Sequence, residues 1–207
     1  MKPPALVVAA SGGGSNLQAV IDAIAAGSLS MRIALVISDQ PTCGAVQRAL
    51  AHNIAVCAIP YPRKATALQR IAWESQAMQV VDCFAPDILL LSGFMRILSS
   101  TTLARVTVPM LNQHPALLPD DGGDSVSLSD GRTIPALRGA HVVRDAIAQR
   151  LPVTGCTIHR VVPEVDRGPV IARVEVAIHP GDDEATLHTR IRAVERQLLI
   201  DTLQTFV

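Results

Sequence analysis

Aromatic residues are scarce in this sequence, since Phe, Trp and Tyr together make up 2% of its 207 residues. Charge of either sign is also limited: charged residues make up 17%, and 18 Lys and Arg balance 18 Asp and Glu. Such a chain lacks the basic surface that binds nucleic acid or an anionic membrane, so we expect small-molecule partners. No apolar run has the length of a membrane span, and the run after Met1 is too short for an export signal, which predicts a soluble, cytoplasmic protein.

Cysteines with the spacing of a metal site or a disulfide framework are absent as well. The four cysteines, Cys43, Cys57, Cys83 and Cys156, lie far apart within apolar segments. Small core residues in a reducing compartment explain that distribution best, and no metal is expected. The sequence also lacks internal repeats and low-complexity tracts, so we predict a single domain over residues 1–207 that buries a core without disulfides or a structural metal.

What the sequence does contain is an alternation of apolar runs and helical patterns. Short, continuous apolar runs predict buried strands, and apolar residues three or four positions apart predict helices. The predicted strands cover residues 5–10, 32–39, 55–59, 87–92, 110–114, 153–162 and 168–178, and the predicted helices 17–24, 44–51, 65–84, 140–150 and 183–206. This order predicts an α/β fold with a Rossmann-like, mostly parallel sheet and helices on both faces.

A short polar stretch after Pro119 interrupts this alternation. Within it, Val126 and Leu128 alternate with polar residues, and Ile134 closes the pattern. Asp130 and Gly131 have the composition of a type I′ turn. We therefore predict an inserted β-hairpin near residues 125–134.

Three polar clusters follow predicted strands, and ligands of parallel sheets bind at the carboxyl ends of the strands. The first, Gly12–Asn16, is a glycine-rich turn that suits a phosphate, although tight strand-to-helix packing would also need glycine. The second is Gly93–Leu98. In the third, Asn112 and His114 lie two positions apart, so their side chains share one face. They can stabilise a carbonyl oxygen that gains charge, although such a pair alone is more often a loop hydrogen bond.

Four segments together resemble glycinamide ribonucleotide formyltransferase, in the family's order and at close to its spacing. They are Ser11–Gln18, Gly93–Ser99, Leu111–Pro119 and Glu164–Val170. The resemblance covers nearly the whole chain apart from the predicted hairpin. It implies that the formyl group of 10-formyltetrahydrofolate, a co-substrate, passes to the amine of 5′-phosphoribosylglycinamide in the third step of purine synthesis. The oligomeric state stays open between a monomer and a homodimer.

The resemblance also assigns roles to individual residues. They are Asn112, His114 and Asp166 for catalysis; Gly14, Ser15, Asn16, Arg192 and Glu195 for the phosphate and ribose of the substrate; and Arg70, Met95, Arg96, Leu98, His141 and His159 for folate. Arg192 and Glu195 are three positions apart on a predicted helix, so we expect them on the same face.

The chemistry of the three catalytic residues agrees with these roles. Attack of an amine on the formyl carbon creates a tetrahedral centre with a negative oxygen, which Asn112 and a protonated His114 stabilise. Asp166 favours the charged imidazole and moves the proton from the attacking nitrogen towards folate N10, directly or through water. Without the resemblance, Asp166 would be interpreted as a turn residue, and Arg192 with Glu195 as a solvated pair.

Two alternative functions stay open at this point. Formyltetrahydrofolate hydrolase has a similar Asn–His–Asp set with water as acceptor, but it normally carries an N-terminal regulatory domain, whereas this chain begins at its first strand. A non-catalytic nucleotide- or folate-binding homologue is expected to have lost one of the three residues. The hairpin departs from the family pattern, and we hypothesise that it covers part of the active-site mouth because it begins close after His114.

Overall fold

The computed structural model describes residues 2–207, and seven of its strands form one sheet in the order β3-β2-β1-β4-β5-β8-β9. The chain divides into two compact units: the residues up to Leu111 with Leu203–Val207, and Asn112–Thr202. The division falls inside β5 (Met110–His114), so the order β3-β2-β1-β4-β5 belongs to the first unit and β5-β8-β9 to the second. The single domain over residues 1–207 stays a prediction.

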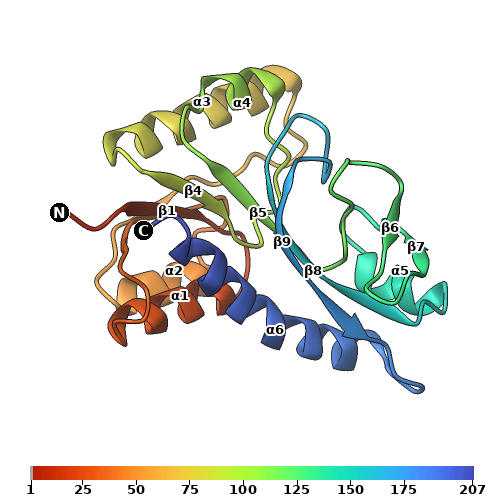
Figure 1. Cartoon of the computed structure of the whole chain (residues 1–207). Coiled ribbons are helices and arrows are strands. Elements are labelled where there is room, and N and C mark those ends of the chain that lie inside the picture. The colour runs from red at the N-terminus through yellow and green to blue at the C-terminus, as the bar shows by residue number, and fades with distance from the viewer. Residues whose placement is uncertain (1) are drawn as a thin grey trace. The chain divides into compact units, whose positions relative to one another are not determined.

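Strands and helices alternate in the first unit as predicted (Figure 1). Its elements are β1 (Ala5–Ala9), α1 (Ser15–Ala25), β2 (Arg32–Ser38), α2 (Gly44–Ala51), β3 (Val56–Ala58), α3 (Ala67–Cys83), β4 (Ile88–Leu91) and α4 (Ser100–Arg105). Strand β1 pairs in parallel with β2 and β4, and β2 with β3. Helices α1 and α2 cover one face of these strands, and α3 and α4 cover the other (Figure 1). The predicted α/β fold is confirmed.

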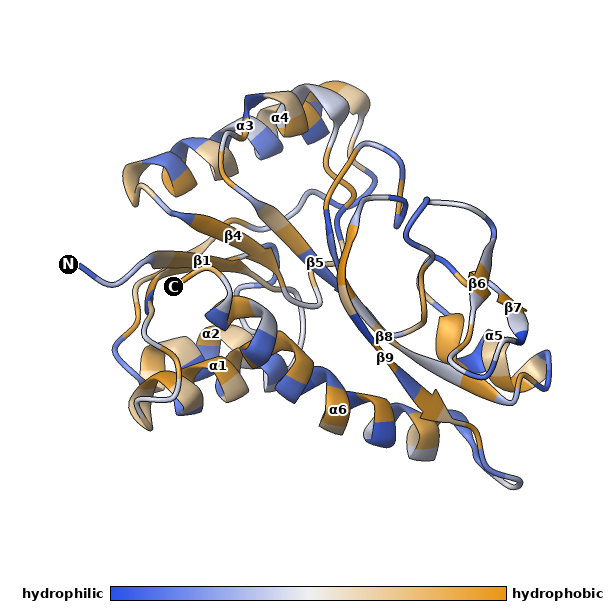
Figure 2. Cartoon of the chain, in the orientation of Figure 1, coloured by the Kyte–Doolittle hydropathy of each residue, from blue (hydrophilic) through white to orange (hydrophobic). Residues whose placement is uncertain are grey.

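The apolar runs explain why β1 and β4 lie at the centre of this unit. Every residue of both strands is buried, and Figure 2 shows the hydrophobic colour along β4. Parallel strands covered by helices on both faces require such continuous apolar sequences. Only α4 was missed by the sequence analysis, because six residues are too few to show an apolar period. The cap of α4 is polar instead, since the Ser99 hydroxyl accepts a hydrogen bond from the Thr102 amide.

The single tryptophan of the chain joins α3 to the loop that follows β4. Trp73 is 5% exposed, and its indole Nε1 donates a hydrogen bond to the Ile59 carbonyl oxygen at 2.9 Å. Its ring is stacked with Phe94, with centroids 6.2 Å apart, and meets the Tyr61 ring edge-on at 5.3 Å. The scarce aromatic residues therefore fix the start of the Gly93–Leu98 loop.

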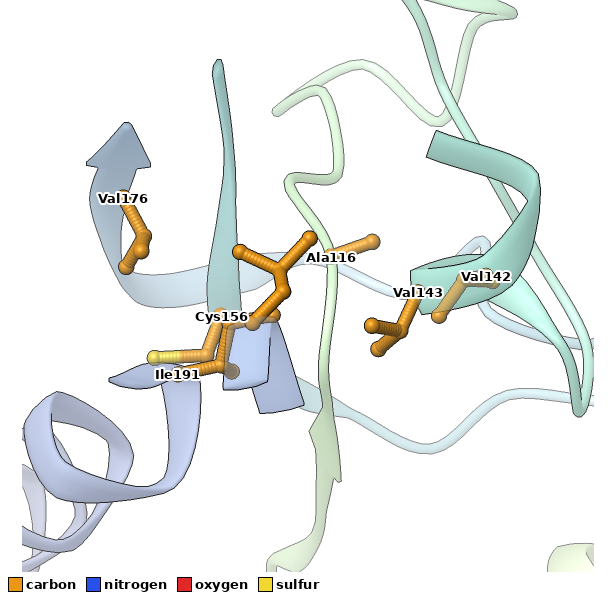
Figure 3. Packing of buried hydrophobic residues seen from close by; sticks show 7 residues of the cluster. Ala116, Val142, Val143, Cys156, Val176 and Ile191 are labelled. Carbon is orange, nitrogen blue, oxygen red and sulfur yellow. The ribbon is translucent and has the colours of Figure 1, made fainter. Parts of the chain in front are cut away.

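The second unit is built on an antiparallel strand pair. Its further elements are β6 (Ser125–Ser127), β7 (Thr133–Pro135), α5 (Val142–Ala148), β8 (Val153–Arg160), β9 (Val170–Ala177) and most of α6 (Glu184–Gln204). Strands β8 and β9 pair in antiparallel register. Side chains from α5, β8, β9 and α6 form a common core with Ala116, the second residue after β5 (Figure 3). Hydrophobic and hydrophilic residues alternate along α6 (Figure 2), and its buried side chains include Leu187, Ile191 and Leu199.

The inserted hairpin is confirmed, but its predicted turn type is wrong. Strands β6 and β7 pair in antiparallel register, and Val126, Leu128 and Ile134 are buried together with Leu117. The Gly131 amide donates to the Leu128 carbonyl oxygen, and Gly131 has φ 85°. A type I′ turn would also place Asp130 at positive φ, whereas only the glycine adopts that conformation here. The loop is one residue longer than predicted: Ser129 and Asp130 form the centre of the turn, and Gly131 follows in the left-handed conformation.

The cysteines are less buried than the sequence analysis predicted. All four are free thiols, but Cys83 is exposed and Cys43 and Cys57 are half-buried. Only Cys156 is a core residue, and burial raises the pKa of its thiol to about 12.

Within residues 2–207, no helix is long and apolar enough to cross a lipid bilayer.

Candidate active site

Strand β5 carries Asn112 and His114 to its carboxyl end, where Pro115 stops the strand. The chain beyond the proline is held by Thr157 of β8. The Thr157 hydroxyl donates to the Ala116 carbonyl oxygen at 2.8 Å and accepts from the Leu118 amide at 3.0 Å. These buried hydrogen bonds fix the exit of the strand and with it the direction of the two polar side chains.

His114 lies between two hydrogen-bond acceptors. The side chain is 4% exposed, its Nε2 lies 2.8 Å from the Leu137 carbonyl oxygen, and its Nδ1 lies 3.4 Å from Oδ2 of Asp166. A neutral imidazole carries one N–H and can donate to only one of these oxygens, whereas the imidazolium can donate to both. The site is therefore shaped to stabilise a proton on His114.

Burial opposes that proton in the free protein. Desolvation lowers the pKa of His114, while the Asp166 carboxylate and the Leu137 carbonyl raise it, and the net direction is downward. The sequence analysis expected a protonated His114. The structure favours a neutral ring in the free protein, with both acceptors in place to hold a proton once negative charge forms beside it.

Asp166 sits in the turn between β8 and β9 with its backbone in the left-handed region, at φ 53°. Its Oδ2 accepts a hydrogen bond from the Gly139 amide at 3.1 Å, and its Oδ1 lies 3.6 Å from Nε2 of His159. Burial raises the pKa of this carboxyl, but the contacts with His159, His114 and Gly139 lower it further, so the net direction is downward. Asp166 is thus a buried carboxylate that stays ionised at neutral pH.

His159 links Asn112 to the same carboxylate. The Nδ1 of His159 lies 2.9 Å from the Arg160 carbonyl oxygen, which fixes the orientation of the ring. Its Nε2 lies 3.2 Å from the amide nitrogen of Asn112 as well as 3.6 Å from Asp166 Oδ1. The contact with His159 orients the Asn112 amide and leaves its second N–H for another acceptor.

The pKa of His114 provides a direct test of this geometry. We expect its ring to titrate below the ordinary value of about 6.5. In the Asp166→Asn variant the pKa falls further, because the negative charge that favours the imidazolium is gone while the desolvation persists. Titration of the histidine ring signals by NMR measures both values. The exposed Asp201→Asn change is the control, and an upward shift in Asp166→Asn would contradict the proposed pairing.

Gly168 holds the turn that carries Asp166 in place. A Cβ at this position would lie 1.8 Å from the Arg160 carbonyl oxygen, so Gly168→Ala must displace the backbone. We expect a loss of about 1–3 kcal/mol in the free energy of unfolding, measured by urea denaturation, and reduced turnover. Gly181→Ala is the matched control: its φ is 88° and the space around it is open. It should cost about 1 kcal/mol without loss of turnover.

The predicted phosphate turn lies in the first unit, at the start of α1. Gly14 is the N-cap, with φ 73°, and a Cβ on it would lie 2.6 Å from Cα of Ala45, so its conformation and its close approach to α2 both require glycine. No atom lies within 4 Å of a Cβ on Gly12 or Gly13. The first amides of α1, at Ser15 and Asn16, begin a helix of 11 residues without an acidic side chain in its first turn. Packing thus explains Gly14, and the helix start suits an anion.

The predicted folate residues Arg70, Met95, Arg96 and Leu98 also belong to the first unit. The Met95 amide donates to the Ser11 hydroxyl at 3.0 Å, which joins this loop to the glycine-rich turn. Arg96 binds buried Asp39 at 2.6 Å, stacks over the Tyr61 ring and lines an open cavity of about 400 Å³. The Met95 side chain is exposed and Leu98 is buried, while Arg70 is exposed on α3.

The remaining predicted residues lie on helices of the second unit. Glu195 is buried on α6 with Ile191 and Leu199, whereas Arg192 is exposed. Their three-residue spacing thus does not give them the same environment. His141 is the N-cap of α5 and is exposed, without a side-chain cap hydrogen bond.

The sequence analysis missed the segment Leu137–Gly139, which contacts His114 and Asp166. The Leu137 carbonyl reaches His114, the Gly139 amide reaches the Asp166 carboxylate, and the Arg138 guanidinium donates to the Asp166 carbonyl oxygen at 3.1 Å. Two of these contacts come from the backbone, which has no signature in the sequence. The glycine at position 139, which adopts φ 89° in the structure, was the one feature of the sequence that could have indicated an unusual backbone here.

The fold and this cluster define an α/β protein with a partly buried Asn–His–Asp site suited to acid–base catalysis of a group transfer. Comparison with known proteins identifies the family. Residues 5–203 match the formyl transferase family, and the chain belongs to that family.

Individual relatives agree with this assignment. The chain is 38% identical over 198 residues to a phosphoribosylglycinamide formyltransferase of Mycobacterium tuberculosis, covering 96% of this chain and 82% of the relative. It is 31% identical over 194 residues to that of Escherichia coli K12, covering 93% and 82%. The crystal structure of phosphoribosylglycinamide formyltransferase from Bacillus halodurans is similar with a TM-score of 0.83 and 34% identity, covering 97% of this chain and 94% of that one.

Proposed function

We propose that this protein transfers the formyl group of 10-formyltetrahydrofolate to the amine of 5′-phosphoribosylglycinamide, giving formylglycinamide ribonucleotide and tetrahydrofolate. The observation that carries the proposal is the cluster of Asn112, His114 and Asp166 in a chain 38% identical to a relative of that name. The reaction is the third step of purine biosynthesis. The absence of a membrane-spanning helix within residues 2–207 and the free thiols fit an enzyme of the cytoplasm.

In this reaction, Asn112 supplies a donor to the oxygen that gains negative charge, and a protonated His114 supplies a positive charge beside it. The second N–H of the Asn112 amide is held in place by the contact of the first with His159. A protonated His114 donates its two ring N–H groups to Leu137 and Asp166, so these acceptors stabilise the cation. Donors fixed in advance in a buried site are worth more than the same donors in water.

Asp166 acts on the proton of the attacking nitrogen. Its pKa lies below the ordinary value, so the carboxylate is ionised before the amine arrives and can move that proton towards folate N10, directly or through water. Holding both reactants in line supplies much of the remaining rate enhancement, since no covalent intermediate with the protein is needed.

Further residues are assigned to substrate binding. We assign the phosphate to Gly14, Ser15, Asn16 and Arg192, and the ribose to Glu195. The folate donor supplies the activated formyl group. The cavity at Arg96 is lined by Asp39, which pairs with Arg96, and by Arg63 and Lys64, whose positive charges fit the carboxylates of such a molecule. His141 and His159 stay predicted folate contacts.

A spectrophotometric assay of tetrahydrofolate release tests the proposal. The purified chain is given a 10-formylfolate donor with and without phosphoribosylglycinamide. Release only in the presence of the amine is the expected result. Release without the amine would identify a hydrolase, and no release in either case would identify a non-catalytic binding protein; both would overturn the proposed transfer.

A further inference from the structure

The inserted segment between Pro119 and Leu137 is fixed to the rest of the second unit at several points. Val126, Leu128 and Ile134 are buried in a cluster with Leu117. At the tip, Ser129 binds Glu175 of β9 through its amide at 2.7 Å and its hydroxyl at 3.0 Å. An insertion anchored by both apolar and polar contacts is a support rather than a freely moving lid.

Arg138 connects this insertion to the catalytic turn. Its side chain is 16% exposed, and its Nε donates to the Asp166 carbonyl oxygen at 3.1 Å. Its Nη atoms donate to the loop in front of β6: to Asp124 Oδ1 at 3.3 Å, to the Gly122 carbonyl oxygen at 3.3 Å and to the Gly123 carbonyl oxygen. One guanidinium thus joins three consecutive loop residues to the backbone of a catalytic residue.

The Asp166 backbone needs such an anchor. Its φ of 53° lies in a region that residues with a Cβ adopt at a cost, and such a conformation persists only where the surroundings enforce it. The contact from Arg138 satisfies the carbonyl oxygen of this residue, and the Gly139 amide satisfies its carboxylate. Because Leu137 on the other side of Arg138 binds His114, a shift of this arginine would move contacts of both catalytic side chains.

We propose that Arg138 is a positioning residue of the proposed transferase. Together with Arg167, whose guanidinium donates to the same Gly122 carbonyl oxygen and to Asp124, it links the inserted loop Gly122–Asp124 to the Asp166 turn, and Arg138 alone also fixes the Leu137–Gly139 segment in the reactive geometry. The proposal rests on the proposed function and adds to it a role for the insertion. A planar guanidinium with donors on several sides is required, because a lysine ammonium is a single point that cannot reach the Asp166 carbonyl and the loop at once.

Kinetics of Arg138→Gln test the proposal. We expect kcat to fall by about 10- to 100-fold, with the KM of both substrates changed by less than about 3-fold, since misplacement of reacting groups lowers turnover more than binding. Arg138→Lys keeps the charge and should lose kcat to a similar extent. Arg132→Gln is the matched control, because Arg132 pairs only with Asp130 at the exposed hairpin tip in the contacts within residues 2–207. It should leave both parameters unchanged.

A second readout does not depend on turnover. Asp166 and Leu137 both raise the pKa of His114, so Arg138→Lys, which keeps the charge but loses the anchoring hydrogen bonds, should lower that pKa in an NMR titration, whereas Arg132→Gln should leave it at the wild-type value. An arginine that acts only through its charge would not produce this pattern. Wild-type kcat in Arg138→Lys, or an unmoved His114 pKa in that variant, would overturn the proposal. Inactivity of the wild type and of Arg132→Gln would instead overturn the proposed function itself.

Discussion

Replacing Asp166 by Asn is expected to slow formyl transfer by about a thousand-fold while folate binding changes little. Asparagine is the matched substitution because it also tolerates the left-handed backbone that this turn requires, at φ 53°. The variant keeps an oxygen that can accept from the Gly139 amide, but it loses the charge that takes the proton and that favours imidazolium at His114. Steady-state kinetics and calorimetric titration with a folate analogue measure the two effects.

Two results would count against this role of Asp166. Turnover within about ten-fold of the wild type would show that another group moves the proton. A loss of folate affinity as large as the loss of turnover would show that Asp166 acts in binding. Asp201→Asn, an exposed aspartate on α6, serves as the control and should leave both measurements unchanged.

Replacing His114 by Asn is expected to lower turnover by about 100- to 1,000-fold. Asparagine keeps one amide donor near the Asp166 carboxylate but cannot become a cation. The transition state therefore loses the proton that both acceptors around the ring are placed to hold. Single-turnover measurements with saturating substrates separate this chemical step from binding and product release.

The pH dependence of the His114→Asn variant completes this test. In the wild type, part of the profile reports the titration of His114, whose pKa lies below its ordinary value. That part should vanish in the variant, and His179→Asn, at an exposed histidine of the second unit, should retain it. A variant with the full wild-type profile would exclude His114 as the titrating group.

The strands and helices could be predicted because their sequences are locally consistent. The fully buried strands β1 and β4 have the continuous apolar runs of covered parallel strands, and α3 begins with a capping box formed by Thr66 and Gln69. The short helix α4 lacks such a period. The reversal at Gly131 depended on the loop being one residue longer than the sequence suggested.

The sequence could predict only the part of the candidate site that is formed by side chains. The spacing of Asn112 and His114 placed both at the end of β5, and the family resemblance added Asp166 from about fifty residues further along the chain. The Leu137 carbonyl and the Gly139 amide could not be foreseen, because any residue supplies these groups. The downward direction of the His114 pKa also depends on burial, which local sequence does not report.

The packing of Trp73 makes the indole fluorescence of this protein sensitive to the loop that follows β4. Because the chain contains one tryptophan, its indole emission has a single origin, and that ring is stacked with Phe94 at the start of the loop that carries Met95 and Arg96. Arg96 lies 4.2 Å from the centre of the Tyr61 ring, which itself contacts the indole. If the folate binds beside this loop, as proposed, we expect the surroundings of the indole to change, so that binding can be followed by fluorescence without an attached dye.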